Sequence, residues 1–171
     1  MQVIFDTGSA WAWVFSEKCK SANCPVQNKK YLQSKSSEYH NNEKTAQMLQ
    51  YGKGAIIGHP STDRACFGGD NKHCLDQLSF LTVIKAADIS SLKGSGLIGL
   101  APTPDKGDDQ FNDPLHKGVP GFVAQLKHSA AYEKDFDPVF SFYLSNDTNE
   151  KGKMIFGGTD YEKFAKKGLG E

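Results

Sequence analysis

The sequence lacks an excess of either charge and any long apolar run. Its 171 residues contain 20 Lys and Arg against 20 Asp and Glu, so the formal net charge is zero at pH 7. This balance argues against a basic nucleic-acid-binding module and against an acidic disordered tail. No apolar segment approaches the ~20 residues that a membrane-spanning helix requires. We therefore expect a globular domain that binds no nucleic acid and has no membrane span in this segment.

A secretory leader is also missing from the first residues. Such a leader has a basic start followed by an apolar stretch, whereas residues 1–5 are followed at once by Asp6. Yet the sequence has four cysteines, which suit an oxidising compartment better than the cytosol. The two observations agree if this segment is the interior part, or a truncated form, of a longer protein of the secretory pathway.

Spacing alone leaves the state of the cysteines open, because four cysteines allow three disulfide pairings. The local pairs Cys19–Cys24 and Cys66–Cys74 are favoured, since turn-forming residues separate the second pair as in a stapled hairpin. A zinc site that adds His73 is the rival interpretation. Structural zinc sites usually have two closely spaced cysteine pairs, and only the first pair meets that requirement. Free thiols are the third alternative, and we expect no metal.

Short apolar runs separated by turn residues predict a mainly β, single-domain fold. Residues 16–45 are expected to be irregular with short helical turns, and residues 105–118 to form a surface loop. A short helix is expected over 120–126, with Pro120 near its first turn, and Thr159-Asp160 could cap a helical turn that runs through Phe164. The expected strands are residues 2–5, 11–15, 47–51, 55–58, 78–84, 96–101, 139–144 and 153–156.

One turn combines residues with chemical potential. Asp6-Thr7-Gly8-Ser9 follows an apolar strand, and short hydroxyl side chains can bond a carboxylate and hold it ionised and oriented. Gly8 would let the backbone turn sharply. Taken alone, the motif is equally well read as an ordinary turn in which an Asp side chain bonds nearby backbone.

The order of several motifs resembles the amino-terminal lobe of pepsin-like aspartic proteases over nearly the whole chain. Asp6-Thr7-Gly8-Ser9 is followed by Trp13-Val14 at the family's spacing, and Tyr51-Gly52-Lys53-Gly54 resembles the flap that closes over substrate. Residues 96–101 resemble the strand that packs against the catalytic loop. The remaining similarities are the Cys19–Cys24 loop, the turn Ser36-Ser37-Glu38-Tyr39, residues 140–144, and Phe156-Gly157-Gly158.

The resemblance implies an all-β fold, with residues 1–171 forming a single lobe with short helices and the carboxyl-terminal lobe missing. In this family two aspartates, one from each lobe, share a proton and activate a water that hydrolyses a peptide bond. Asp6 would be one of them, supported by Thr7, Gly8 and Ser9. Peptide or protein substrates, no cofactor, and a lysosomal, vacuolar or extracellular location follow from the same resemblance.

The flap residues Tyr51, Gly52 and Lys53 would bind substrate together with Trp13, which the Tyr51 hydroxyl would contact. Plain aromatic core packing is the alternative for Trp13 and Tyr51. Glycines on both sides of Lys53 are expected to let the flap move. Lys53 itself is unusual at a flap tip, and its charge could favour acidic substrate side chains.

The sequence departs from the family in having one catalytic motif. No second Asp-Thr-Gly or Asp-Ser-Gly occurs. The segment Asp147-Thr148-Asn149 lacks the glycine, and Asn146-Asp147-Thr148 instead forms an acceptor sequence for N-glycosylation. Further departures are Ser95, where the family often has an acidic residue, and the Cys66–Cys74 pair, which pepsin lacks. Two other functions therefore stay open: an inactive peptide-binding half-molecule, and a homodimeric protease of the retroviral type.

Overall fold

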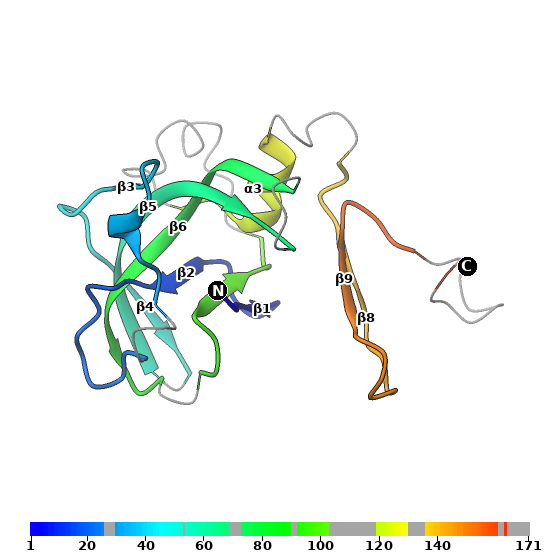
Figure 1. The fold of residues 1–171 in the computed structure, drawn as a ribbon, viewed down its shortest axis with the longest axis horizontal. Helices are drawn as coiled ribbons and strands as arrows, with labels where there is room; N and C mark the ends of the chain where they lie inside the picture. Colours follow the sequence, from blue (N-terminus) through cyan, green and yellow to red (C-terminus); the bar gives the residue numbers. More distant parts are fainter. Residues whose placement is uncertain are drawn as a thin grey trace.

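The computed structural model describes residues 1–25, 30–52, 54–68, 73–89, 92–102, 119–129, 136–160 and 163. Figure 1 shows a large twisted sheet with one short helix against it, and a separate two-stranded hairpin beside it. Within the described residues, no helix is long and apolar enough to cross a bilayer. The fold is all-β with short helices, as the sequence predicts.

Seven strands form the main sheet in the order β1-β7-β2-β6-β5-β3, and β4 pairs with the remaining part of β5. The hairpin consists of β8 and β9. The elements are β1 (Ile4–Asp6), β2 (Ala12–Phe15), η2 (Gln33–Lys35), β3 (His40–Asn41), β4 (Gln47–Tyr51), β5 (Gly54–Cys66), β6 (Cys74–Ala87), β7 (Gly96–Gly99), α3 (Phe122–His128), β8 (Phe140–Tyr143) and β9 (Lys153–Phe156).

The strands β5 and β6 are much longer than the sequence predicts, with 13 and 14 residues. Polar residues in the middle of β5 interrupt its apolar pattern, so the sequence predicts only residues 55–58 of this strand. Among them, Asp63 is only 7% exposed, and it accepts hydrogen bonds from the Tyr31 hydroxyl and from the Ser36 hydroxyl at 2.9 Å. Burial of a charged group is tolerated when its hydrogen bonds are satisfied in this way.

Both faces of the main sheet are covered by apolar side chains. Neighbouring residues point to opposite faces of a strand, so Ala12 and Ile98 join one buried cluster while Trp13 and Leu97 join the other. The first cluster also includes Phe122 from α3. Burial on both faces explains why the central strands are continuously apolar rather than alternating.

Helix α3 is fastened to the sheet by one buried amide. The Gln125 side chain accepts a hydrogen bond from the Ser79 backbone N–H at 2.7 Å and donates to the Ser79 carbonyl oxygen at 3.0 Å. It also donates to the Pro120 carbonyl oxygen at 2.9 Å. The expected helix at 120–126 is therefore present, shifted by two residues at each end. The expected loop at 105–118 lies outside the described residues, as does most of the expected turn that ends at Phe164.

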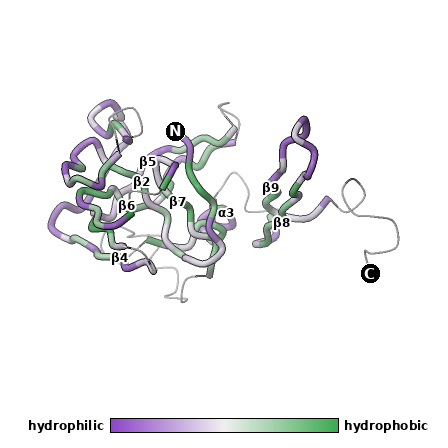
Figure 2. Tube along the Cα trace, turned by 90° about the horizontal axis from the view of Figure 1, so that it is seen from below, coloured by the Kyte–Doolittle hydropathy of each residue, from purple (hydrophilic) through white to green (hydrophobic). Residues whose placement is uncertain are grey.

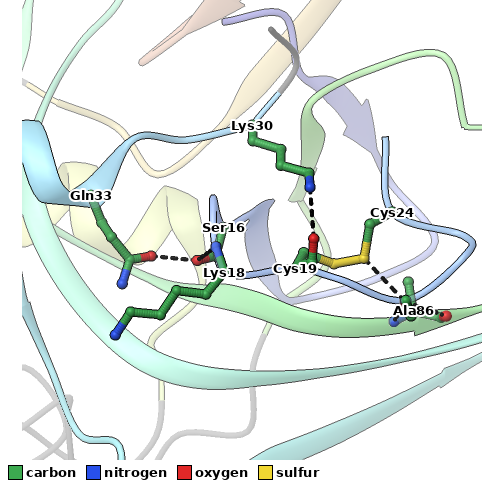
Figure 3. The surroundings of a disulfide bond; sticks show 8 residues. Ser16, Lys18, Cys19, Cys24, Lys30, Gln33 and Ala86 are labelled. Carbon is green, nitrogen blue, oxygen red and sulfur yellow. Dashed lines mark hydrogen bonds between the residues drawn. A yellow bond between two sulfur atoms is a disulfide. The ribbon is translucent and has the colours of Figure 1, made fainter. Parts of the chain in front are cut away.

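Two disulfides join the local cysteine pairs that the sequence favours. Cys66 and Cys74 lie directly opposite each other, where β5 ends and β6 begins, so this bond links the two strands of the long hairpin. Cys19–Cys24 closes a small loop after β2. Figure 3 shows Lys30 donating a hydrogen bond to the Cys19 carbonyl oxygen, at 2.6 Å. The Ser21 hydroxyl within the loop donates to the Ala86 carbonyl oxygen of β6 and accepts from the Ala86 N–H, both at 2.9 Å. Both bonds suit an oxidising compartment.

Candidate active site

The turn that carries Asp6 crosses over a strand that lies between its two flanking strands. Asp6 ends β1, and β2 begins at Ala12 after the turn. Strand β7 lies between them, parallel to β1 with Asp6 opposite Gly99 and antiparallel to β2 with Ala12 opposite Ile98. The carboxyl group of Asp6 therefore stands at the end of β1, the outermost described strand on this side of the main sheet, next to the buried strand β7.

Gly99 allows the turn to lie directly against β7. A Cβ atom at this position would be 2.5 Å from the Ser9 carbonyl oxygen and 2.6 Å from the Trp11 backbone nitrogen, closer than side-chain carbons approach other atoms. Three backbone hydrogen bonds of 2.8 to 3.0 Å tie residues 99–101 to the turn, from Gly99 to Trp11, Leu100 to Asp6, and Ala101 to Ser9. Backbone contacts thus fix the position of the turn against β7.

Each carboxylate oxygen of Asp6 has its own hydrogen-bond donor. The Gly8 backbone N–H donates to Oδ1 at 2.9 Å, and the Ser9 hydroxyl donates to Oδ2 at 2.7 Å. Hydrogen bonds from a backbone N–H and a hydroxyl favour an oriented carboxylate. Asp6 is half-buried, so it is held in place and is still reachable by water or substrate. Thr7 is exposed beside it.

The strand β4 brings Tyr51 to the same site from 45 residues further along the sequence. The indole N–H of Trp13 donates a hydrogen bond to the Tyr51 hydroxyl at 2.7 Å, and the two ring centroids are 6.2 Å apart. Trp13 is 2% exposed, which makes this contact both a core contact and a link between sheet and flap. Its geometry is the one that the resemblance implies.

Burial raises the pKa of the Tyr51 hydroxyl above its ordinary value. The hydrogen bond from Trp13 lowers this pKa, but by less than burial raises it. The negative charge of Asp6 contributes further to the rise in pKa. The tyrosine therefore stays neutral and able to donate or accept a hydrogen bond, and it is close enough to Asp6 to feel its charge.

The two glycines that flank position 53 differ in their surroundings, and the expectation that they let the flap move stays a prediction. A Cβ atom at Gly52 would have nothing within 4 Å. At Gly54, by contrast, it would lie 2.3 Å from the Ala87 carbonyl oxygen, so this glycine allows close packing of β5 on the end of β6. Ala55 pairs with Ala87 there. Lys53, between the two glycines, lies outside the described residues.

The structure adds residues that the sequence analysis does not single out. Ile89 and Leu92 pack against the same buried cluster as Trp13, and the Ile89 side chain also lies directly beside Gly54. No sequence motif marks them, because their role depends only on where β6 ends. Within the described residues, no three His, Cys, Asp or Glu side chains gather as a metal site.

Comparison with known proteins relates this arrangement to a family. The family described as "Eukaryotic aspartyl protease" matches residues 1–168. Aspartic proteinase A1 of Arabidopsis thaliana is 34% identical over 166 residues, which cover 95% of this chain and 30% of that protein. Phytepsin of Hordeum vulgare is 35% identical over 163 residues, covering 92% of this chain and 29% of that protein.

A fungal relative extends the comparison. Vacuolar protease A of Neurospora crassa is 32% identical over 168 residues, covering 97% of this chain and 38% of that protein. The chain thus spans about a third of the length of the curated relatives that it matches.

Proposed function

The chain belongs to the eukaryotic aspartyl protease (pepsin-like) family, and we propose that residues 1–171 are the amino-terminal lobe of an aspartic endopeptidase in which Asp6 is one of two catalytic carboxylates. The observation that carries this proposal is the geometry of Asp6, whose two oxygens are held by Gly8 and Ser9 at the end of β1, beside the buried strand β7. The second aspartate comes from the carboxyl-terminal lobe, since the 171 residues contain a single Asp-Thr-Gly.

The reaction follows from placing two carboxyl groups side by side. Like charges a few ångströms apart cannot both ionise easily, so the pair holds one proton and works in acid. The ionised carboxylate takes a proton from a water as that water attacks the scissile carbonyl carbon. The protonated partner stabilises the developing oxyanion. Proton transfer to the amide nitrogen then releases the amine and the new carboxyl group, with no covalent enzyme intermediate.

The remaining site residues position the catalytic carboxylate and the substrate. Ser9 and Gly8 fix the orientation of Asp6, and Thr7 braces the turn against the second lobe. Tyr51 and Gly52 cover the peptide from the flap, and closure of the flap excludes water from the reacting bond. Trp13 holds Tyr51 in place through their hydrogen bond. The charge of Lys53 at the flap tip favours acidic substrate side chains.

Two observations support a location in the secretory pathway, in a lysosome or vacuole or outside the cell. The disulfides Cys19–Cys24 and Cys66–Cys74 require an oxidising compartment to form. A relative of this chain is named a vacuolar protease, and an acidic vacuole suits a carboxyl pair that works with one proton.

The proposal is tested by measuring cleavage of a peptide library between pH 3 and 5 with three samples. These are the chain alone over a range of concentrations, the chain mixed with the carboxyl-terminal lobe of a relative, and that lobe alone. A pepstatin-type inhibitor serves as the control for aspartic protease activity in each sample.

We expect cleavage only in the mixed sample, at a rate that follows the concentration of the two-lobe complex. Cleavage by the chain alone that rises with the square of its concentration would establish a homodimeric enzyme instead. Peptide binding without cleavage in a stable two-lobe complex would establish an inactive peptide-binding protein.

A further inference from the structure

The turn of the β8–β9 hairpin contains the one tripeptide of the sequence that matches Asn-X-Ser/Thr, with X other than Pro. This tripeptide is Asn146-Asp147-Thr148. Such a sequence is an acceptor for an N-linked oligosaccharide when its asparagine lies on the surface of a protein that passes through the secretory pathway. Sequence matches of this length are common, so the structure of the turn decides whether the asparagine is available.

The hairpin is attached to the rest of the lobe at one end, and the turn lies at the other. Phe140 pairs with Phe156 at the attached end, where the Phe156 ring lies 5.8 Å from that of Phe5 and 5.4 Å from that of Phe122. Tyr143 pairs with Lys153 at the opposite end, just before the turn. Figures 1 and 2 both show this turn away from the sheet and from β4, and Figure 2 shows it as hydrophilic.

The hydrogen bonds within the turn are made by residues that neighbour Asn146 and Thr148. The Asp147 backbone N–H donates to the Ser145 hydroxyl at 3.1 Å, and the Asn149 backbone N–H donates to the Asp147 carboxylate at 2.8 Å. The Glu150 carboxylate accepts hydrogen bonds from the hydroxyls of Tyr143 at 2.8 Å and Ser145 at 3.2 Å. These bonds shape the turn without involving the side chains of Asn146 or Thr148.

The side chains of Asn146 and Thr148 are therefore accessible at the same time. Both are exposed, and neither side chain makes a hydrogen bond to any residue in the described part of the chain. A transferase must reach the asparagine amide and the hydroxyl two residues later at the same time, and here both are accessible. The Asp147 carboxylate between them is engaged with Asn149, also through the Asn149 side-chain amide at 3.2 Å.

We propose that Asn146 carries an N-linked oligosaccharide. In the transfer, a bond forms between Nδ2 of Asn146 and carbon C1 of the first sugar. The bond between C1 and the diphosphate oxygen of a lipid-linked oligosaccharide breaks, the lipid diphosphate leaves, and the amide loses one proton to a base of the transferase. No oxidation or reduction takes place.

The modification has a structural consequence for the hairpin. Phe142 on β8 and Leu144 directly after β8 precede Asn146, and their exposed fractions are 47% and 84%. Exposed apolar residues on a short hairpin invite association with other chains. A hydrated oligosaccharide on Asn146 covers this end of the hairpin, while the Asp6 turn and the flap stay clear of it.

The test is expression of the chain behind a secretion leader in eukaryotic cells, followed by intact-mass measurement before and after peptide N-glycosidase treatment. The variant Thr148→Ser keeps the acceptor sequence, whereas Thr148→Ala and Asn146→Gln remove it. All three substitutions are at exposed turn positions, so they leave the fold intact. The mass is read on the pool that holds both disulfides, whether it is secreted or retained in the cell lumen.

We expect the wild type and Thr148→Ser to lose one oligosaccharide on treatment, with conversion of residue 146 to aspartate, and the other two variants to show no change. A disulfide-bonded wild type at its unmodified mass would overturn the proposal, as would an oligosaccharide on Thr148→Ala. Because the readout is mass, this result is independent of whether the chain is a peptidase.

Discussion

The catalytic turn and the flap are the two halves of the candidate site, and they are held in different ways. The turn lies on β7 with backbone atoms so close that only glycine fits at position 99, and three backbone hydrogen bonds fasten it. The incoming strand of the flap, β4, pairs only with β5 among the described strands. Its last residue, Tyr51, reaches the turn side of the site through a side-chain hydrogen bond to Trp13.

This difference suits a site that must keep one group still and move another. Catalytic groups lose efficiency when they are displaced by even an ångström, so a carboxylate fixed by the sheet is favourable. A cover must open for substrate and product, and a single neutral hydrogen bond contributes only about 1 kcal/mol. We infer that the Asp6 turn is rigid and that the flap opens by a hinge movement. The predictions that distinguish the two parts are given in order of decreasing effect.

The largest effect is expected for Gly99→Ala, because the new Cβ would clash with the backbone of Ser9 and Trp11. Neither neighbour can move without disturbing the turn, so we expect a loss of about 3 kcal/mol or more in the free energy of unfolding. Chemical denaturation monitored by tryptophan fluorescence measures this loss.

Gly52→Ala is the matched control, since a Cβ at this flap glycine has nothing within 4 Å. We expect a change within about 0.5 kcal/mol, as is usual for exposed positions. Equal destabilisation by the two substitutions would show that the Asp6 turn is no more tightly packed than the flap.

Tyr51→Phe is expected to have the next largest effect. It leaves the indole N–H of Trp13, a 2% exposed residue, without its acceptor. A buried unsatisfied donor costs about 1–3 kcal/mol. Hydrogen exchange of the β4 amides should accelerate, while exchange of the β7 amides should not. Uniform acceleration in both strands would mean that the flap does not open separately.

Ser9→Ala removes the hydroxyl that bonds Oδ2 of Asp6 and leaves the backbone contacts of the turn in place. In a two-lobe enzyme we expect roughly a tenfold fall in kcat, equivalent to ~1.4 kcal/mol, which lies within the usual strength of a hydrogen bond to a charged group. KM should change little. A rise in KM with an unchanged kcat would assign Ser9 to substrate binding instead.

The smallest effect near neutral pH concerns two tyrosines, Tyr51 at the end of β4 and Tyr31, whose hydroxyl donates a hydrogen bond to Asp63 of β5. Burial and the hydrogen bond to Asp63 strongly raise the pKa of Tyr31 from its ordinary 10.0, and burial raises that of Tyr51. The folded chain therefore holds these protons more tightly than the unfolded chain does. Stability should be constant below about pH 10 and fall as the pH rises further.

Denaturation curves between pH 8 and 11 for the wild type and Tyr31→Phe measure this dependence. We expect a weaker alkaline loss of stability in the variant, and a smaller difference for Tyr51→Phe, whose pKa is less displaced. An unchanged alkaline slope in Tyr31→Phe would contradict the assignment of this loss to the Tyr31–Asp63 pair.

Much of the fold could be predicted from the sequence because apolar runs and turn residues mark the short strands. The β8–β9 hairpin lies within a residue of its expected limits, and both disulfides join the favoured pairs. The lengths of β5 and β6 could not be predicted. Their extension depends on buried polar residues such as Asp63, whose hydrogen-bond partners come from residues 27 to 32 positions earlier.

The site could be predicted in part for the same reason. The Asp6 motif is local, and a hydroxyl three residues after a carboxylate is a recognisable pattern. The packing role of Gly54 could not be predicted, because the close approach of Ala87 depends on the pairing of two distant strands. Ile89 carries no local signal, since only its place just after β6 brings it beside Gly54.

The most direct test of the account is the effect of Asp6→Asn on peptide cleavage by the chain in complex with a carboxyl-terminal lobe. Asparagine keeps the size of the side chain, its oxygen can still accept from the Gly8 N–H, and its NH₂ group can donate to the Ser9 hydroxyl oxygen. The substitution removes the charge, so we expect cleavage to fall by about 10² to 10⁴-fold. The control Asp137→Asn, at an exposed residue, should retain full activity. Undiminished cleavage by a stable Asp6→Asn complex would contradict the claim that the Asp6 carboxylate activates the water.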